Sequence, residues 1–388
     1  MPGNGGSSSS GGLVLAHVSD LHVSRYGEHV TSLRTTLRSR QGLQDEDWTN
    51  LEVLDGWHIQ RRVKWRWRLR DAEDALELRL LDDEGYVQTR RKGKRSDETA
   101  LRKDLETVAQ DRHLTEHSRL ARRLPELPRV LELLEDDPTN TNLRFLRAAW
   151  MLREADPDWI LITGDVTDDG IGYDIVEAAL RPFFDRGRVL AIPGNHDVYD
   201  SPPLVVPPHE RKDVGKKRDL WKPFARKIGL GDEPFWVREL GEGALVAAVD
   251  SCTPAWTPLS ASGEVPGECL TALGKVLDGA DLPVKLGMLH HHVVNPPILH
   301  VGRAPWQLGM RLRNAKEVYD FFVERKFAAV LNGHRHLGYR YHPPWAPLFL
   351  SAPSATLGDR TGGRPYFWRL EIRGGELVSV RERPLSRD

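Results

Sequence analysis

Short apolar runs, each ending at a turn that carries polar side chains, recur along this sequence. Five of these runs have the length of a buried β-strand, although any single run also fits a buried helix. They occupy residues 13–19, 159–163, 189–193, 284–289 and 327–332. Because turn residues flank each run, we interpret all five runs as buried strands.

The turns after these runs carry side chains that bind metals. They are Asp20-Leu21-His22, Gly164-Asp165, Gly194-Asn195-His196-Asp197, His290-His291-His292 and Gly333-His334-Arg335-His336. Open α/β sheets gather ligands at the carboxyl ends of their strands, so we expect these turns to meet in space. One such segment alone would be an ordinary turn or a helix cap. All five in this order are hard to produce by chance.

The ligand types indicate a pair of transition metals. Carboxylate, amide and imidazole groups suit Mn, Fe or Zn, and the absence of thiolates disfavours a structural zinc finger. Seven candidate ligands are too many for one tetrahedral ion and suit two ions that share a carboxylate. The candidates are Asp20, His22, Asp165, Asn195, His290, His334 and His336.

The same blocks resemble the calcineurin-like metallophosphoesterase superfamily. The matching pattern is Asp20-x-His22, Gly164-Asp165-x-x-Asp168-x-Gly170, Gly194-Asn195-His196-Asp197, His290 and Gly333-His334-x-His336. The resemblance covers residues 13–24 and about 150–388. It implies an α/β fold, a four-layer sandwich of two mixed β-sheets flanked by helices. The residues within the motifs are most similar to those of bacterial phosphodiesterases that act on cyclic nucleotides or other small diesters.

The resemblance also implies how the metals are held. One ion would be bound by Asp20, His22 and His336, and the other by Asn195, His290 and His334. Asp165 would bridge the two ions.

Further residues would act on the substrate. His196 would face the phosphate as a general acid or an electrostatic stabiliser, and Asn195 would also contact the substrate. Asp168 or Asp197 would orient the His196 imidazole, as carboxylates behind functional histidines do. The resemblance favours Asp168, from the Gly-Asp-x-x-Asp pattern. His291 would either support the ligands from behind or touch the substrate.

The expected activity is hydrolysis of a phosphodiester by in-line attack of a metal-bound hydroxide. The alternatives within the superfamily are a nuclease and a phosphomonoesterase. A second alternative is a non-catalytic scaffold that binds a phosphate ligand. The complete ligand set argues against a scaffold, because a retired site should have lost at least one ligand.

A long insert separates the first two blocks. We expect a flexible leader at 1–12, a catalytic domain formed by 13–24 and 141–388, and an inserted α+β region at 25–140. Residues 57–70 alternate between apolar and mostly basic positions, which predicts one long strand with two unlike faces. Residues 75–81 and 86–90 would complete a small antiparallel sheet. Helices are predicted at 96–108, 124–134 and 142–154.

The insert admits three interpretations. In the first, it is a surface extension whose tryptophan face packs on helices and whose basic face is solvated. In the second, it is a cap whose arginines contact an anionic substrate. In the third, it is a platform on which nucleic acid binds through basic and aromatic residues. The strand pattern argues against the platform, because tryptophans that face away from the arginines would be buried.

Composition and charge narrow the class of protein. The net charge is −1, so no global field favours nucleic acids or membranes, and no apolar run is long enough to insert stably in a bilayer. The two cysteines, Cys252 and Cys269, are too few for a disulfide framework, so we expect reduced thiols and a cytoplasmic location. We expect His17 to be a core histidine. His300 and His342 lie in proline-rich loops, and contact with the substrate is an alternative to a surface position for each of them.

Overall fold

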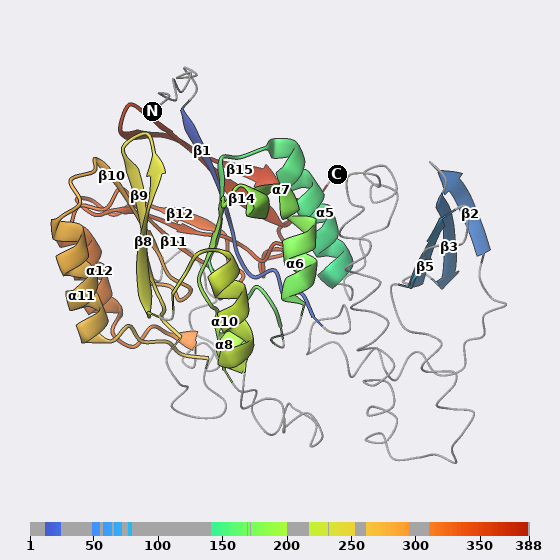
Figure 1. Ribbon diagram of the computed structural model, residues 1–388, viewed down its shortest axis with the longest axis horizontal. Helices are drawn as coiled ribbons and strands as arrows, with labels where there is room; N and C mark the ends of the chain where they lie inside the picture. The colour runs from blue at the N-terminus through green and yellow to red at the C-terminus, as the bar shows by residue number, and fades with distance from the viewer. Residues whose placement is uncertain are drawn as a thin grey trace, which may run out of the picture.

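A computed structural model of the 388-residue chain gives the fold. It describes residues 12–24, 49–54, 57–63, 66–71, 77–79, 141–168, 170, 172–199, 217–231, 233–252, 261–294 and 310–386. Two mixed β-sheets stand face to face with helices outside them, which confirms the predicted four-layer α/β sandwich (Figure 1). None of the helices in these ranges is long and apolar enough to cross a membrane.

The first sheet has the strand order β15-β14-β1-β6-β7. Its strands are β1 (Leu13–Val18), β6 (Trp159–Ile162), β7 (Val189–Ala191), β14 (Tyr366–Arg373) and β15 (Glu376–Pro384). β1, β6 and β7 are parallel, whereas the β14–β15 hairpin pairs antiparallel with β1. The predicted strands at 13–19, 159–163 and 189–193 are therefore confirmed.

The second sheet has the strand order β12-β13-β11-β10-β9-β8. Its strands are β8 (Phe235–Gly241), β9 (Ala244–Val249), β10 (Val284–Met288), β11 (Ala329–Asn332), β12 (Tyr339–Tyr341) and β13 (Leu348–Ser351). The four central strands are parallel, and both edge strands are antiparallel. Candidate ligands follow two of the parallel strands at their carboxyl ends, His290 after β10 and His334 after β11.

Helices cover the outer face of each sheet (Figure 1). α5 (Thr141–Ala155), α6 (Tyr173–Ala179) and α7 (Arg181–Asp185) cover the first sheet, and α11 (Gly267–Asp278) and α12 (Ala315–Glu324) cover the second. Two further helices lie beside the ligand turns, α8 (Asn195–Val198) and α10 (Lys217–Lys227). α5 confirms the helix predicted at 142–154.

Two apolar cores explain why the central strands are apolar at successive positions. Along β1, Leu13 and Leu15 belong to the core shared by the two sheets, while Ala16 and Val18 belong to the core under the helices. A strand covered on both faces has no solvent-facing positions, so its sequence is a continuous apolar run.

His17 interrupts the apolar run of β1, and its Nε2 lies 3.0 Å from Thr163 Oγ1. Burial lowers the pKa of His17 to about 3, so this ring is neutral at neutral pH.

The insert contains a separate antiparallel sheet with the strand order β2-β3-β4-β5, which confirms that the insert holds a small antiparallel sheet. The strands are β2 (Thr49–Leu54), β3 (Trp57–Val63), β4 (Arg66–Asp71) and β5 (Glu77–Arg79). The prediction of one long strand over 57–70 is wrong, because β3 and β4 pair antiparallel as a hairpin. Period-two alternation is the same in one strand and in two strands joined by a tight turn, so the pattern cannot place the reversal. The predicted strand at 86–90 and helices at 96–108 and 124–134 lie outside the described residues.

Phe349 offers a test of the packing beneath the second sheet. Its ring is fully buried and stacks on Tyr319 at 5.6 Å between ring centroids. We expect Phe349→Ala to lower the free energy of unfolding by about 3–5 kcal/mol, because it leaves a cavity. Trp345, which is 97% exposed, supplies the control, and Trp345→Ala should change stability by less than about 0.5 kcal/mol. Urea denaturation of both variants measures the difference, and equal losses would contradict this packing.

Candidate metal centre

Five of the predicted ligands adopt backbone conformations that L-residues rarely adopt. Among the described non-glycine residues, nine have positive φ, and five of these are candidate ligands. They are Asp20 (54°), His22 (48°), Asp165 (49°), His334 (74°) and His336 (53°). Each such residue costs on the order of 1–3 kcal/mol and persists only where the surrounding structure enforces it. The concentration of strained residues at three strand ends therefore indicates a functional site.

Backbone hydrogen bonds join the turn after β1 to the turn after β6. The Asp20 amide donates to Gly164 O at 3.1 Å, and the His22 amide donates to Asp165 O at 3.0 Å. The two hydrogen-bonded turns therefore hold Asp20, His22 and Asp165 side by side.

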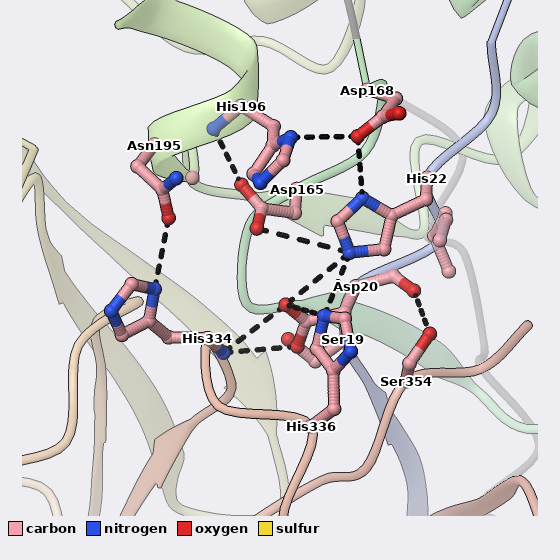
Figure 2. Close-up of polar contacts among 12 residues, drawn as sticks. Ser19, Asp20, His22, Asp165, Asp168, Asn195, His196, His334, His336 and Ser354 are labelled. Carbon is pink, nitrogen blue, oxygen red and sulfur yellow. Dashed lines mark hydrogen bonds and ion pairs between the residues drawn. The ribbon is translucent and has the colours of Figure 1, made fainter. Parts of the chain in front are cut away.

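A segment after β13 holds the same turn from the other side. Ser354 Oγ donates to Asp20 O at 2.7 Å (Figure 2), and Thr356 Oγ1 donates to Leu21 O at 3.0 Å. These bonds satisfy the carbonyl groups of two consecutive buried residues, of which Asp20 has a left-handed backbone. Sequence reasoning missed both hydroxyls, because a serine and a threonine in a loop carry no motif of their own.

The first group of ligand atoms comes from Asp20, His22 and His336, whose ligand atoms all lie within 4.8 Å of one another. His22 Nε2 and His336 Nε2 are 2.8 Å apart, and His336 Nε2 lies 3.4 Å from Asp20 Oδ1. The other nitrogen of His22, Nδ1, faces Asp168 Oδ1 at 3.2 Å. A carboxylate in that place fixes the ring so that Nε2 points into the group.

The second group comes from Asp165, His290 and His334, with Asn195 beside them. His290 Nε2 lies 3.5 Å from Asp165 Oδ2 and 3.2 Å from His334 Nδ1. Asn195 Oδ1 lies 2.9 Å from His334 Nδ1, as Figure 2 shows. His290 Nδ1 faces the carbonyl of Thr163 at 2.7 Å, so it donates there and leaves the lone pair of Nε2 directed into the group.

Asp165 lies between the two groups. Its Oδ2 is 4.0 Å from His22 Nε2 and 3.5 Å from His290 Nε2, while its Oδ1 accepts a hydrogen bond from the His196 amide at 2.8 Å. Burial favours the neutral acid, but the nearby imidazoles of His290 and His196 outweigh it and hold the pKa of Asp165 well below its usual range. The carboxylate is therefore ionised and faces both groups at once.

The two groups fit transition-metal ions. Donor atoms separated by 2.8 to 3.5 Å match the spacing around an ion bound at about 2.0–2.2 Å from each ligand. The donors are carboxylate oxygens, an amide oxygen and imidazole nitrogens, which suit Mn, Fe or Zn. The residues that could hold the ions are Asp20, His22, Asp165, Asn195, His290, His334 and His336.

His196 stands beside the groups with its side chain 29% exposed. Its Nδ1 lies 2.6 Å from Asp168 Oδ1, the oxygen that also faces His22 (Figure 2). Burial lowers the pKa of His196, but the carboxylates of Asp165 and Asp168 outweigh burial and raise the pKa to about 9. Asp168 thus connects a partly exposed imidazole, that of His196, to the buried imidazole of His22.

Asp197 makes different contacts. Its carboxylate accepts hydrogen bonds from the amides of Val166, Thr167 and Gly194 at 2.9 to 3.0 Å. The Tyr173 hydroxyl donates to the same carboxylate at 3.0 Å. Asp197 therefore fastens the loop that carries Asp165 to the loop that carries Asn195, whereas Asp168 is the carboxylate that contacts the His196 ring.

The remaining predicted histidines lie behind or away from the groups. His291 is fully buried, and its ring nitrogens lie 2.8 Å from Ser251 Oγ and 2.9 Å from Ala261 O. His292 Nε2 lies 3.1 Å from Ser351 Oγ. His342 is exposed at the end of β12, and His300 lies outside the described residues. The structure thus brings together all seven predicted ligands and leaves His291 engaged with the protein through both nitrogens.

Close approach between two loops requires a glycine at position 194. A Cβ atom built there would collide with the backbone nitrogen and the carboxylate of Asp165. We expect Gly194→Ala to lower the free energy of unfolding by about 1–3 kcal/mol and to separate the two loops. Gly279→Ala is the matched control, because its Cβ would meet only one carbonyl at 3.7 Å. Thermal unfolding and a crystal structure of each variant measure the effect, and equal stability of the two variants would contradict the proposed contact.

Two solved structures of phosphatases are similar to this chain. Among curated proteins, none matches the sequence. A dimetal phosphatase structure from Danio rerio has a TM-score of 0.44 and 10% identity, with 97% of this chain and 98% of that chain covered. A purple acid phosphatase from yellow lupin (Lupinus luteus) has a TM-score of 0.44 and 12% identity, with 65% of this chain and 52% of that chain covered.

The sequence itself matches a family over more than half of its length. The family is described as calcineurin-like phosphoesterase, and the match spans residues 113–338. Members are metallophosphoesterases, so the family implies a dinuclear metal site and hydrolysis of phosphoric esters. This chain belongs to the calcineurin-like phosphoesterase family and is a phosphoric ester hydrolase.

Proposed function

We propose that the protein is a phosphodiesterase that uses two transition-metal ions. The observation that carries this proposal is the position of Asp165 Oδ2, which faces a histidine of each ligand group. One ion would be held by Asp20, His22 and His336, and the other by Asn195, His290 and His334, with Asp165 shared. Bound ions of this kind supply Lewis acidity toward a phosphoryl oxygen and an activated water.

His196 is the residue that we assign as the proton donor. Its side chain is partly exposed beside the ligand groups, and Asp168 engages Nδ1 from behind. That contact directs the opposite nitrogen, Nε2, away from Asp168 and leaves it available to a leaving-group oxygen. As the P–O bond breaks, the oxygen takes the proton from Nε2, and the imidazole is left neutral. Asp168 is then the positioning carboxylate and Asp197 a support for the loops.

The substrate assignment rests on the resemblance of the motifs to phosphodiesterases of small molecules. Asn195 and His196 are the residues that we place against the phosphate, because both belong to the turn that faces the two ligand groups. His291 is assigned to packing, since both of its ring nitrogens contact other parts of the protein. A nucleic-acid substrate reached through the insert is an outcome of the test below.

The domain division and location are further parts of the proposal. β1 pairs directly with β6, which supports a catalytic domain formed by 13–24 and 141–388 around an insert at 25–140. The strands β2–β5 pair with one another, in keeping with that division. Cys252 and Cys269 are both buried and free, which supports a cytoplasmic location.

Hydrolysis of a diester and a monoester by the Mn²⁺-loaded protein tests the proposal. We expect bis-p-nitrophenyl phosphate to be hydrolysed with the higher kcat/KM, compared with p-nitrophenyl phosphate. Asp165→Asn should lose about 10³-fold, because it removes the shared charge between the ions. Asp185→Asn is the matched control, since this aspartate is 64% exposed and pairs with Arg181 on the surface.

Other outcomes separate the alternatives. Preference for the monoester would make the protein a phosphomonoesterase. Full activity in Asp165→Asn would contradict the shared-ligand site. If neither ester is hydrolysed although elemental analysis finds two bound ions, the phosphodiesterase proposal fails for small substrates, and single-stranded and duplex nucleic acids become the next substrates.

A further inference from the structure

A buried lysine connects the two segments that carry His196 and Asp168. Lys217 is the first residue of α10 and is only 4% exposed. Its Nζ donates to His196 O at 3.0 Å and to Asp168 O at 3.3 Å. No sequence motif marks this residue, and the metal-ligand pattern does not include it.

The placement of Lys217 is not explained by packing alone. Burying an ammonium group carries a large desolvation cost unless hydrogen bonds compensate it. An apolar side chain of similar length would fill the same space without that cost. Two carbonyl groups that accept hydrogen bonds from the ammonium belong to the residues of the proposed proton-donating pair.

α10 has an anchor that does not depend on Lys217. Trp221 and Phe224 on this helix pack against the ring of Tyr173, at 5.9 and 4.8 Å between ring centroids. Both belong to the core under the helices of the first sheet. We therefore expect the helix to remain in place when Lys217 is replaced.

We propose that Lys217 is a positioning residue for the proton donor. Its ammonium group ties the backbone of Asp168 to that of His196, so that Asp168 Oδ1 and His196 Nδ1 keep their 2.6 Å contact during the reaction. This inference rests on the proposed function, in which His196 Nε2 gives its proton to the leaving oxygen. A small shift of either backbone turns Nε2 away from that oxygen, and misplacement on this scale lowers a rate strongly.

Leaving-group dependence distinguishes positioning from a merely structural role. p-Nitrophenolate leaves readily without a proton, whereas phenolate needs one, so loss of the proton donor is felt mainly with phenyl esters. We expect Lys217→Met to lower kcat for diphenyl phosphate about tenfold more than kcat for bis-p-nitrophenyl phosphate, within the 10²–10⁴-fold that general acid catalysis supplies. KM and the bound metal content should be unchanged. Lys222→Met is the matched control, because Lys222 lies on the same helix and pairs with Asp219 at the surface.

A spectroscopic measurement tests the inference independently of turnover. The proton between His196 Nδ1 and Asp168 Oδ1 should give a downfield imidazole N–H resonance, assigned by its disappearance in His196→Ala. Lys217→Met should broaden or remove this resonance, and Lys222→Met should leave it unchanged. An unaltered resonance in a folded Lys217→Met protein overturns the positioning role. Equal losses of kcat for both diesters also overturn it.

The two measurements keep this inference distinct from the proposed function. If the wild-type protein hydrolyses no phosphoester, the proposed function fails, and the resonance still decides whether Lys217 holds the pair. If the wild-type protein is active and the resonance survives in Lys217→Met, only the role of Lys217 fails.

Discussion

The structure depends on one buried carboxylate, that of Asp165, which must face two groups of imidazoles from the end of β6. A charge buried this completely is costly unless charged or polar partners surround it. His290 and His22 approach one oxygen, and the His196 amide donates to the other. The turns that supply these partners end strands of both sheets, so the packing of the two sheets determines the geometry of the site.

Strain at the ligand turns follows from this convergence. The turns after β1, β6 and β11 must bend sharply enough to direct their side chains across the edge of the sandwich, and they do so through residues with positive φ. Hydrogen bonds from outside each turn hold that conformation, such as those of Ser354 and Thr356 to the carbonyls of Asp20 and Leu21. The two apolar cores beneath the strands supply the rigidity against which the turns are bent.

The sequence was sufficient for the strands and for the ligand set, for a physical reason. Strands covered on both faces are continuous apolar runs, and the residues after them are turn residues with metal-binding side chains, so both signals are local. The hairpin at 57–71 was not predictable, because alternation does not show where a chain reverses. Lys217, Ser354 and Thr356 act through hydrogen bonds to backbone carbonyls, and a contact between distant segments leaves no pattern along the chain.

The choice between Asp168 and Asp197 shows the same limit. Both are buried aspartates in the metal-binding motifs, Asp168 in the motif after β6 and Asp197 next to His196, and either suits a supporting role. The family resemblance favours Asp168, and the contacts in the fold distinguish the two residues, since Asp197 accepts hydrogen bonds from backbone amides and Asp168 contacts two imidazoles.

The sharing of Asp165 by two ions can be measured in a crystal structure of the Mn²⁺-loaded protein, with data collected at the manganese absorption edge. We expect two anomalous peaks about 3.5–4 Å apart, with Asp165 contacting both and one histidine pair beside each. A single peak, or two peaks of which Asp165 contacts only one, would contradict the sharing of Asp165.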